Sequence, residues 1–97
     1  MTTCYINGNY KDILKSKVSI TDRGFQFSDG IYEVIAVYEN RFVDIDLHLN
    51  RLIISLNKLK IKINLKVNQI ENISKKIKKL NNLNNGIIYI QITRGDQ

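Results

Sequence analysis

The spacing of the apolar residues changes near position 44, and this change limits the folds open to the chain. From Ile31 to Tyr38 the residues are mostly β-branched or aromatic, which favours a strand whose side chains alternate between two faces. Beyond Asp44 the apolar residues recur at spacings of four and three, as on one stripe of an α-helix. This stripe consists of Ile45, Leu49, Leu52, Leu56 and Leu59. The pattern therefore predicts a strand followed directly by an amphipathic helix, with Asp44 or Asp46 as its N-cap.

Further strands are predicted on the amino-terminal side of this helix. Asn7-Gly8 separates two short apolar segments and favours the tight primed turn of a hairpin. A second hairpin is expected where Glu39-Asn40 turns the chain into a strand from Arg41 to Asp44. Val18 to Ile20 is a short possible strand. Residues 22–30 combine turn formers with two aromatic residues and are interpreted as an ordered loop that contains a helical turn.

The carboxy-terminal half contains a second helical stripe and a final strand. The stripe consists of Val67, Ile70, Ile73, Ile77 and Leu80. Asn81 to Gly86 ends this helix, and Ile87 to Thr93 has the composition of a strand. The order of elements predicts an α+β fold in one small domain, residues 1–97, with two helices on one face of a mostly antiparallel sheet.

Composition narrows the class of protein. No apolar run approaches the roughly 20 residues that span a bilayer, and the single cysteine, Cys4, cannot form an internal disulfide, which suits the cytoplasm. The net charge of +6 raises the alternative of a small basic module that binds nucleic acid or an anionic membrane surface through Lys75–Lys79. Because no aromatic residue interrupts that run, a solvated helix face is the favoured interpretation, and neither nucleic acid nor membrane is predicted as a partner.

Few residues in the sequence have the type and spacing expected of catalytic residues or metal ligands. One cysteine and one histidine exclude a Cys/His metal site, and no glycine-rich phosphate loop is present. The carboxylates of Asp22, Asp29 and Glu33 are interpreted as surface or turn-capping groups, and His48 as a local hydrogen-bonding group. We therefore predict no metal ligand and no catalytic residue in this chain.

Tyr32 and Arg51 stand out among the remaining polar residues. A phenol that follows a glycine turn and opens a strand can bind an anionic group at the edge of a cleft. Arg51 lies beside the apolar helical stripe and can offer a planar fork to a phosphate or carboxylate. The chemistry alone leaves a structural alternative open for each residue: Tyr32 as a tyrosine at the edge of the core, and Arg51 as a surface arginine paired with Asp44 or Asp46.

Three collinear segments resemble a known family. The sequence Asp22-Arg23-Gly24-Phe25-Gln26-Phe27-Ser28-Asp29-Gly30-Ile31-Tyr32-Glu33-Val34 is similar to the signature of D-amino-acid aminotransferases, which are class-IV (fold-type-IV) pyridoxal-phosphate enzymes. His48-Leu49-Asn50-Arg51-Leu52 and Ile90-Gln91-Ile92-Thr93-Arg94-Gly95 resemble the next two blocks of that family. The tyrosine of the first block favours the D-alanine aminotransferase branch, and the fold implied is the family's small amino-terminal domain.

The resemblance implies roles for individual residues. Arg51 would hold the phosphate of pyridoxal 5'-phosphate, Tyr32 would help to bind the substrate α-carboxylate, and Val34 would lie on the substrate side of the same strand. Arg23 and Asp29 would shape the loop rather than contact substrate.

The family's Arg-x-His segment, its coenzyme-bonding lysine and its larger domain are not matched in these 97 residues. We therefore expect a truncated fragment, about a third of the enzyme, that is inactive alone. The alternative is half of a split aminotransferase that a separate carboxy-terminal chain completes. The resemblance also implies a homodimer.

Overall fold

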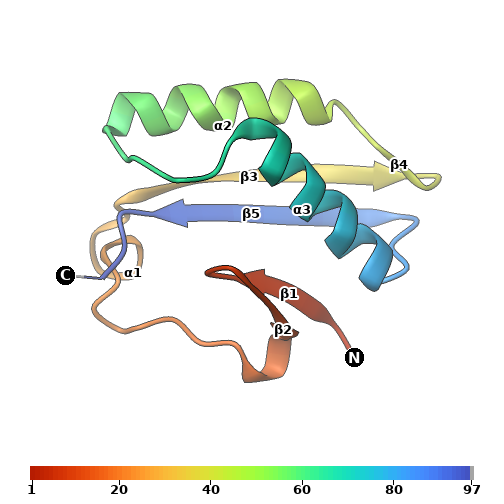
Figure 1. The fold of residues 1–97 in the computed structure, drawn as a ribbon, viewed down its shortest axis with the longest axis horizontal. Coiled ribbons are helices and arrows are strands. Elements are labelled where there is room, and N and C mark those ends of the chain that lie inside the picture. The colour runs from red at the N-terminus through yellow and green to blue at the C-terminus, as the bar shows by residue number, and fades with distance from the viewer. Residues whose placement is uncertain (97) are drawn as a thin grey trace.

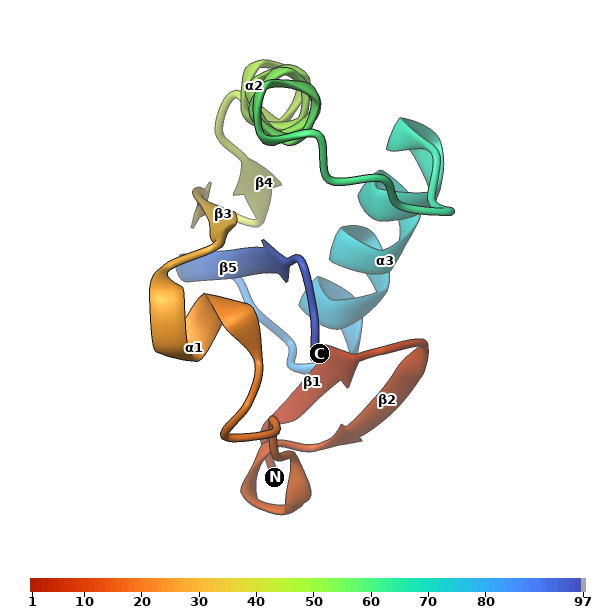
Figure 2. The same ribbon diagram turned by 90° about the vertical axis from the view of Figure 1, so that its left-hand side faces the viewer.

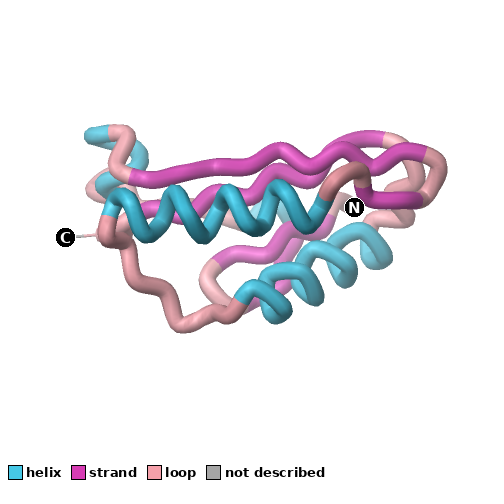
Figure 3. Tube along the Cα trace, turned by 90° about the horizontal axis from the view of Figure 1, so that it is seen from above, coloured by secondary structure: helices cyan, strands magenta, loops and turns pink. Residues whose placement is uncertain are grey.

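A three-stranded antiparallel sheet forms the centre of the fold in the computed structural model, which describes residues 1–96. Its strands are β3 (Gly30–Tyr38), β4 (Arg41–Phe42) and β5 (Gly86–Thr93), in the order β4-β3-β5. The long helix α2 (Ile45–Leu59) covers one face of this sheet and runs along the strands (Figures 1 and 3). The predicted α+β class is confirmed.

A separate two-stranded hairpin lies beside this sheet. Strands β1 (Thr3–Ile6) and β2 (Asn9–Asp12) are joined at Asn7 and Gly8, whose φ angles of 48° and 93° are the left-handed values that a primed turn requires. Helix α3 (Val67–Leu80) packs beside α2 and against β1, so it joins the hairpin to the main sheet (Figure 2).

Two short helices and some strand limits differ from the sequence prediction. A 3-10 helix, η1 (Ile13–Lys15), follows the hairpin, and the predicted helical turn is the short helix α1 (Arg23–Phe27). The strand predicted at residues 18–20 is wrong: these residues form a loop in which Val18 and Ile20 are exposed. Strand β4 ends at Phe42 rather than Asp44, because Asp44 adopts a left-handed conformation that starts α2.

The predicted helical stripe forms the core. Leu49, Leu52 and Leu56 of α2 are buried against Ile35 of β3, and burial along β3 alternates as a one-sided strand requires. Ile70 of α3 joins the same cluster. The core therefore lies between the sheet and the two helices, and the opposite face of the sheet stays exposed.

The loop before β3 is tied to the end of β5. Asp22 is the N-cap of α1, where its side chain accepts a hydrogen bond from the Gly24 backbone and another from the Thr93 hydroxyl. A Cβ on Gly24 would lie 2.1 Å from Thr93 Cγ2, so a larger residue would push α1 off the strand. The first signature segment is thus fixed in space by the last.

We predict that Leu52→Ala lowers the free energy of unfolding by about 2–5 kcal/mol, because it removes three buried carbon atoms and leaves a cavity at a fully enclosed site. A domain of this size has little stability to lose, so the variant should be largely unfolded at 37 °C. Urea unfolding followed by circular dichroism measures the effect. Leu47→Ala, an exposed position on the same helix, is the matched control and should change stability by less than about 0.5 kcal/mol.

Candidate functional site

A buried carboxylate lies between β3 and α2. The Glu33 side chain is only 5% exposed and accepts hydrogen bonds from Arg51 Nε at 2.8 Å and Arg51 Nη2 at 2.7 Å. His48 Nδ1 lies 2.7 Å from the same Glu33 Oε1. A buried carboxylate is stable only when its oxygens are paired in this way.

The local sequence explains how these three groups meet. Glu33 and Ile35 are two residues apart on β3, so both side chains point to the strand face that packs against α2. His48 and Arg51 are three residues apart on α2, so they project from the same side of the helix one above the other. The hydrogen bonds from Arg51, followed by the one with His48, lower the pKa of the Glu33 carboxyl despite its burial, and Glu33 in turn raises the pKa of Arg51.

This pairing differs from the sequence expectation. Glu33 was expected at the surface or in a turn, and Arg51 was considered as a partner of Asp44 or Asp46; both expectations are wrong. The missed signal was an acidic residue within the otherwise apolar set of alternate positions on β3, which indicates a buried and partnered charge. His48 was expected to hydrogen-bond locally, but its partner at 2.7 Å is Glu33, 15 positions away on β3.

Arg51 is held rigidly and still reaches the surface. Glu33 engages its Nε and Nη2, and neither of those bonds uses Nη1. The Arg51 side chain is 66% exposed, so the free part of the guanidinium faces solvent. A fork fixed on one side and open on the other can bind an anionic oxygen without a large loss of side-chain entropy.

The other two predicted site residues lie on the opposite face of β3. Tyr32 is exposed and stacks on Tyr89 of β5, with ring centroids 5.6 Å apart and planes inclined by 15°. Val34 is also exposed on this face. The structure therefore brings Tyr32 and Val34 together but does not bring either into contact with Arg51, which lies on the helix-covered face.

One edge of β3 is open between these two faces. Strand β4 pairs only with Val37 and Tyr38, so within residues 1–96 no strand pairs with residues 30–35 on this side. The Ala36 carbonyl points to this side, since it accepts a hydrogen bond from the Val43 backbone at 2.9 Å. Because backbone groups alternate in direction along a strand, those of Tyr32 and Val34 point to the same open edge.

A second ionic cluster fixes the loop at the start of β3. Asp29 Oδ2 accepts hydrogen bonds from Arg94 Nε at 2.7 Å and Arg23 Nε at 2.8 Å, and these bonds, with Arg94 the larger cause, lower the Asp29 pKa. Arg94 Nη2 also donates to the Leu59 carbonyl at 2.8 Å, at the end of α2. Both arginines are thus engaged in holding the loop, β5 and α2 together, as expected for Arg23 and Asp29.

The lysine-rich face makes several contacts within the molecule. Lys75 pairs with Glu71 at 2.9 Å, Lys76 lies over the Tyr10 ring, and Lys78 donates to Asn40. These contacts are those of an ordinary helix surface. In the described residues no helix has the length and apolar character needed to cross a bilayer.

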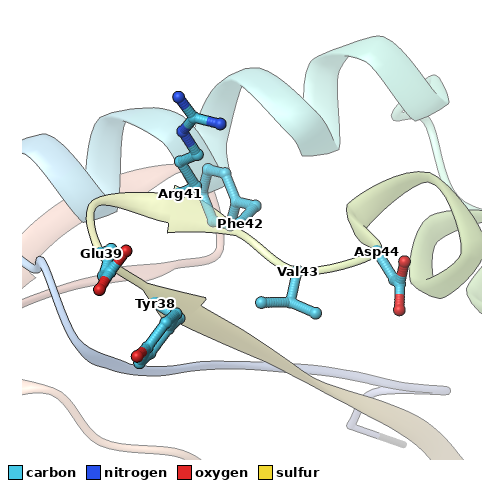
Figure 4. A pocket seen from close by; sticks show the side chains of 6 residues that line it. All are labelled: Tyr38, Glu39, Arg41, Phe42, Val43 and Asp44. Carbon is cyan, nitrogen blue, oxygen red and sulfur yellow. The ribbon is translucent and has the colours of Figure 1, made fainter.

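A shallow hollow at the turn between β3 and β4 contains none of the predicted site residues. Figure 4 shows its lining side chains: Tyr38, Glu39, Arg41, Phe42, Val43 and Asp44. Arg41 points away from Glu39 and Asp44 rather than toward them, so the polar groups do not converge on one point. We assign no site to this hollow.

Comparison with known proteins agrees with the fold and with the signature segments. The structure superposes on branched-chain amino acid aminotransferase from Escherichia coli with a TM-score of 0.89 at 19% identity, covering 93% of this chain and 32% of that one. This likeness defines the fold as that of the amino-terminal part of a class-IV aminotransferase. The family model for amino-transferase class IV matches residues 30–97, and the chain belongs to this family.

Curated relatives give a more specific likeness. D-alanine aminotransferase of Staphylococcus haemolyticus is 39% identical over 95 residues, which are 98% of this chain and 34% of that protein. D-alanine aminotransferase of Listeria monocytogenes is 35% identical over 92 residues, which are 95% of this chain and 32% of that protein. The chain thus spans about a third of the length of these relatives.

We predict that Glu33→Gln lowers the free energy of unfolding by about 1–3 kcal/mol at pH 7, because it removes a buried charged partner of Arg51. The Glu33 pKa is lowered in the fold, so its stabilisation is present above the unfolded-state pKa of about 4.3 and is lost as the pH falls through the folded-state pKa. The difference between wild type and variant should therefore shrink below about pH 4.

Urea unfolding at pH 7, 5, 4 and 3 measures this difference. Glu71→Gln removes a surface ion pair with Lys75 and is the control; it should cost less than about 1 kcal/mol at any pH. The Asp29 pKa is also lowered, but Asp29 is present in all three proteins, so its contribution cancels in the comparison. A Glu33→Gln variant as stable as wild type at pH 7 would contradict the prediction.

Proposed function

We propose that this chain supplies the amino-terminal, anion-binding part of a D-alanine aminotransferase, with Arg51 holding the phosphate of pyridoxal 5'-phosphate. The observation that supports this most is the Arg51 guanidinium, which a buried carboxylate fixes on one side and which stays open to solvent on the other. The similarity to D-alanine aminotransferases over 98% of the chain supports the substrate class.

The residues present fit the coenzyme's phosphate. A dianionic phosphate needs a donor with a fixed direction, and the Glu33–Arg51 pair provides one, because Glu33 prevents rotation of the guanidinium plane. The Nη1 group is left to donate to a phosphate oxygen. When bound, pyridoxal phosphate supplies an electron sink for loss of a proton from the α-carbon of an amino acid.

Tyr32 and Val34 would act on the substrate rather than on the coenzyme. The Tyr32 hydroxyl would donate a hydrogen bond to the α-carboxylate, and Val34 would provide an apolar wall beside it. Because Arg51 lies on the other face of β3, one ligand can reach all three residues only past the open edge at residues 30–35. We therefore propose that the coenzyme and substrate lie along that edge.

Amino-group transfer would also need the remaining two thirds of the family's length. This portion of the matched relatives would supply the lysine that bonds to the coenzyme, either in one chain with this sequence or as a separate complementing chain. A homodimer is the assembly proposed for the completed enzyme. The alternative of a basic nucleic-acid- or membrane-binding module has no support, since the lysines that would form its surface make ordinary intramolecular contacts.

A chimera tests the proposal directly. Residues 1–97 would replace the corresponding third of the S. haemolyticus D-alanine aminotransferase, which they match at 39% identity. We expect the chimera to show the absorbance of bound pyridoxal phosphate and to transfer the amino group of D-alanine to a 2-oxo acid. A folded chimera that neither binds the coenzyme nor transfers amino groups would refute the proposed function.

In this chimera, Arg51→Lys should weaken pyridoxal phosphate binding by about tenfold or more, because lysine keeps the charge but cannot pair with Glu33 and phosphate at once. Coenzyme titration followed by absorbance measures the dissociation constant. Arg41→Lys, an exposed arginine of β4, is the matched control and should leave it unchanged. Equal affinities for the Arg51→Lys and wild-type chimeras would remove Arg51 from the phosphate site.

Tyr32→Phe in the same chimera should raise the KM for D-alanine by about three- to tenfold with little change in coenzyme affinity, because one hydrogen bond to the carboxylate is lost while the ring remains. Steady-state kinetics measure KM and kcat separately. Tyr38→Phe removes a hydroxyl from the far end of the same strand face and serves as the control. An unchanged KM would exclude the Tyr32 hydroxyl from substrate binding.

A further inference from the structure

His48 shares the buried Glu33 carboxylate with Arg51. The His48 Nδ1 atom lies 2.7 Å from Glu33 Oε1, and that same oxygen accepts a hydrogen bond from Arg51 Nη2 at 2.7 Å. The second carboxylate oxygen, Oε2, accepts from Arg51 Nε at 2.8 Å. The carboxylate that supports the exposed guanidinium is therefore itself held by a residue other than the arginine.

The charge on Glu33 decides which atom of this contact carries the proton. Hydrogen bonds from Arg51 and, after it, His48 lower the pKa of the Glu33 carboxyl despite its burial, so the group is ionised at neutral pH and only accepts. The donor is then His48 Nδ1–H, and Nε2 is the ring nitrogen left for another partner. Because its acceptor is charged, this hydrogen bond is stronger than one between neutral groups.

The two bonds from Arg51 do not fix the direction of the ion pair by themselves. They hold the guanidinium and the carboxylate in one plane, but that plane can still turn about the last torsion of the Glu33 side chain. This torsion is broad in glutamate, without the sharp minima of the torsions nearer the backbone. A further donor from a second residue restricts the torsion, and His48 supplies that donor.

The His48 side chain is well placed to act as an anchor. It lies in the first turn of α2, where its backbone N–H donates to the Asp44 carbonyl at 3.1 Å. Its side chain is only 22% exposed and has fewer rotatable bonds than that of Arg51, so its ordering costs less conformational entropy. A short and mostly enclosed side chain thus holds the carboxylate on which the longer, exposed arginine depends.

We propose that His48 is a positioning residue of the anion site: its Nδ1–H fixes the Glu33 carboxylate, and the carboxylate in turn directs the Arg51 guanidinium toward the phosphate. His48 would act through Glu33 and not by contact with the phosphate. The inference rests on the proposed function, since it concerns the site at which Arg51 holds the coenzyme. The competing roles are direct contact of His48 Nε2 with the phosphate and a contribution to stability alone.

The mobility of Arg51 in the 97-residue chain tests the first step without the coenzyme. Nitrogen NMR relaxation measures the order parameter of the Arg51 Nε–Hε bond in wild type, His48→Asn and His48→Leu. The asparagine N–H lies at the place of Nδ1–H, whereas leucine has no donor. The order parameter should fall in His48→Leu toward the values below about 0.6 that mark flexible groups, and should stay near wild type in His48→Asn. The Nε–Hε bond of Arg41 on β4 is the internal control and should not change.

Coenzyme affinity in the chimera with the S. haemolyticus remainder tests the second step. His48→Leu should weaken pyridoxal phosphate binding by about two- to tenfold, the effect of one hydrogen bond, and leave the binding of pyridoxal, which lacks the phosphate, unchanged. His48→Asn should bind pyridoxal phosphate as wild type does. His48→Gln, whose amide lies at the place of Nε2 rather than Nδ1, should be weakened like His48→Leu. A variant that only loosens the fold would weaken the binding of both compounds alike.

A double-mutant cycle tests whether His48 acts through Glu33. In the Glu33→Gln chimera one carboxylate oxygen is replaced by an amide nitrogen, so the two-bond contact with Arg51 is already broken. His48→Leu should then weaken pyridoxal phosphate binding by less than about twofold more. The same two- to tenfold loss on this background would show that His48 acts independently of Glu33 and would overturn the proposal.

The outcomes separate this inference from the proposed function. An unchanged Arg51 order parameter in His48→Leu would overturn the positioning role. Unchanged affinity of the His48→Leu chimera, with affinity lost in Arg51→Lys, would overturn it and leave the proposed function intact. A His48→Gln chimera that binds like wild type while His48→Asn is weakened would replace positioning by direct contact with the phosphate. A chimera with the natural residues that binds no coenzyme would refute the proposed function, and the role of His48 in phosphate binding with it.

Discussion

The antiparallel pairing of β3 with β5 is the constraint on which the rest of the structure depends. It joins residues 30–37 to residues 86–93, and the two helices between them, α2 and α3, contribute to one core with β3. Helix α2 follows directly from β3 and packs its leucine stripe on Ile35. The same pairing brings the loop before β3 against the end of β5, where Asp29 holds Arg23 and Arg94. Arg94 also bonds to the end of α2, so the loop before β3, the end of β5 and the end of α2 meet at one end of the sheet.

The pairing also explains why a charge can be buried at the centre of the domain. Glu33 occupies a core-facing position on β3 and would be costly without partners. Helix α2 places His48 and Arg51 above it, one helical turn apart, so both carboxylate oxygens are bonded. The hydrogen bonds that stabilise the buried Glu33 carboxylate also hold the exposed Arg51 guanidinium in a fixed position. A fixed and exposed cation is the property that an anion site needs.

The two unpaired edges of the sheet have different surroundings. The edge of β3 at residues 30–35 lies between the face with Arg51 and the face with Tyr32, and it is where the proposed ligands would lie. The edge of β5 faces a cleft beside β1 whose described lining side chains are uncharged. Soluble domains seldom leave two such edges bare, because unpaired strand edges promote association. Within residues 1–96 no strand pairs with β3 at residues 30–35 on one edge or with β5 on the other.

Local sequence determined the elements of this protein: the primed turn at Asn7-Gly8, the alternating strand at 31–38 and the two helical stripes depend on residues within a few positions of one another. The isolated segment at 18–20 was predicted wrongly, because a short apolar run does not become a strand without a partner edge. Only the tertiary structure decided that Glu33 pairs with Arg51, that Tyr32 faces away from both, and that β1 and β5 flank a cleft. These features join residues that lie 18 or more positions apart, and their energy comes from burial and pairing that no local pattern encodes.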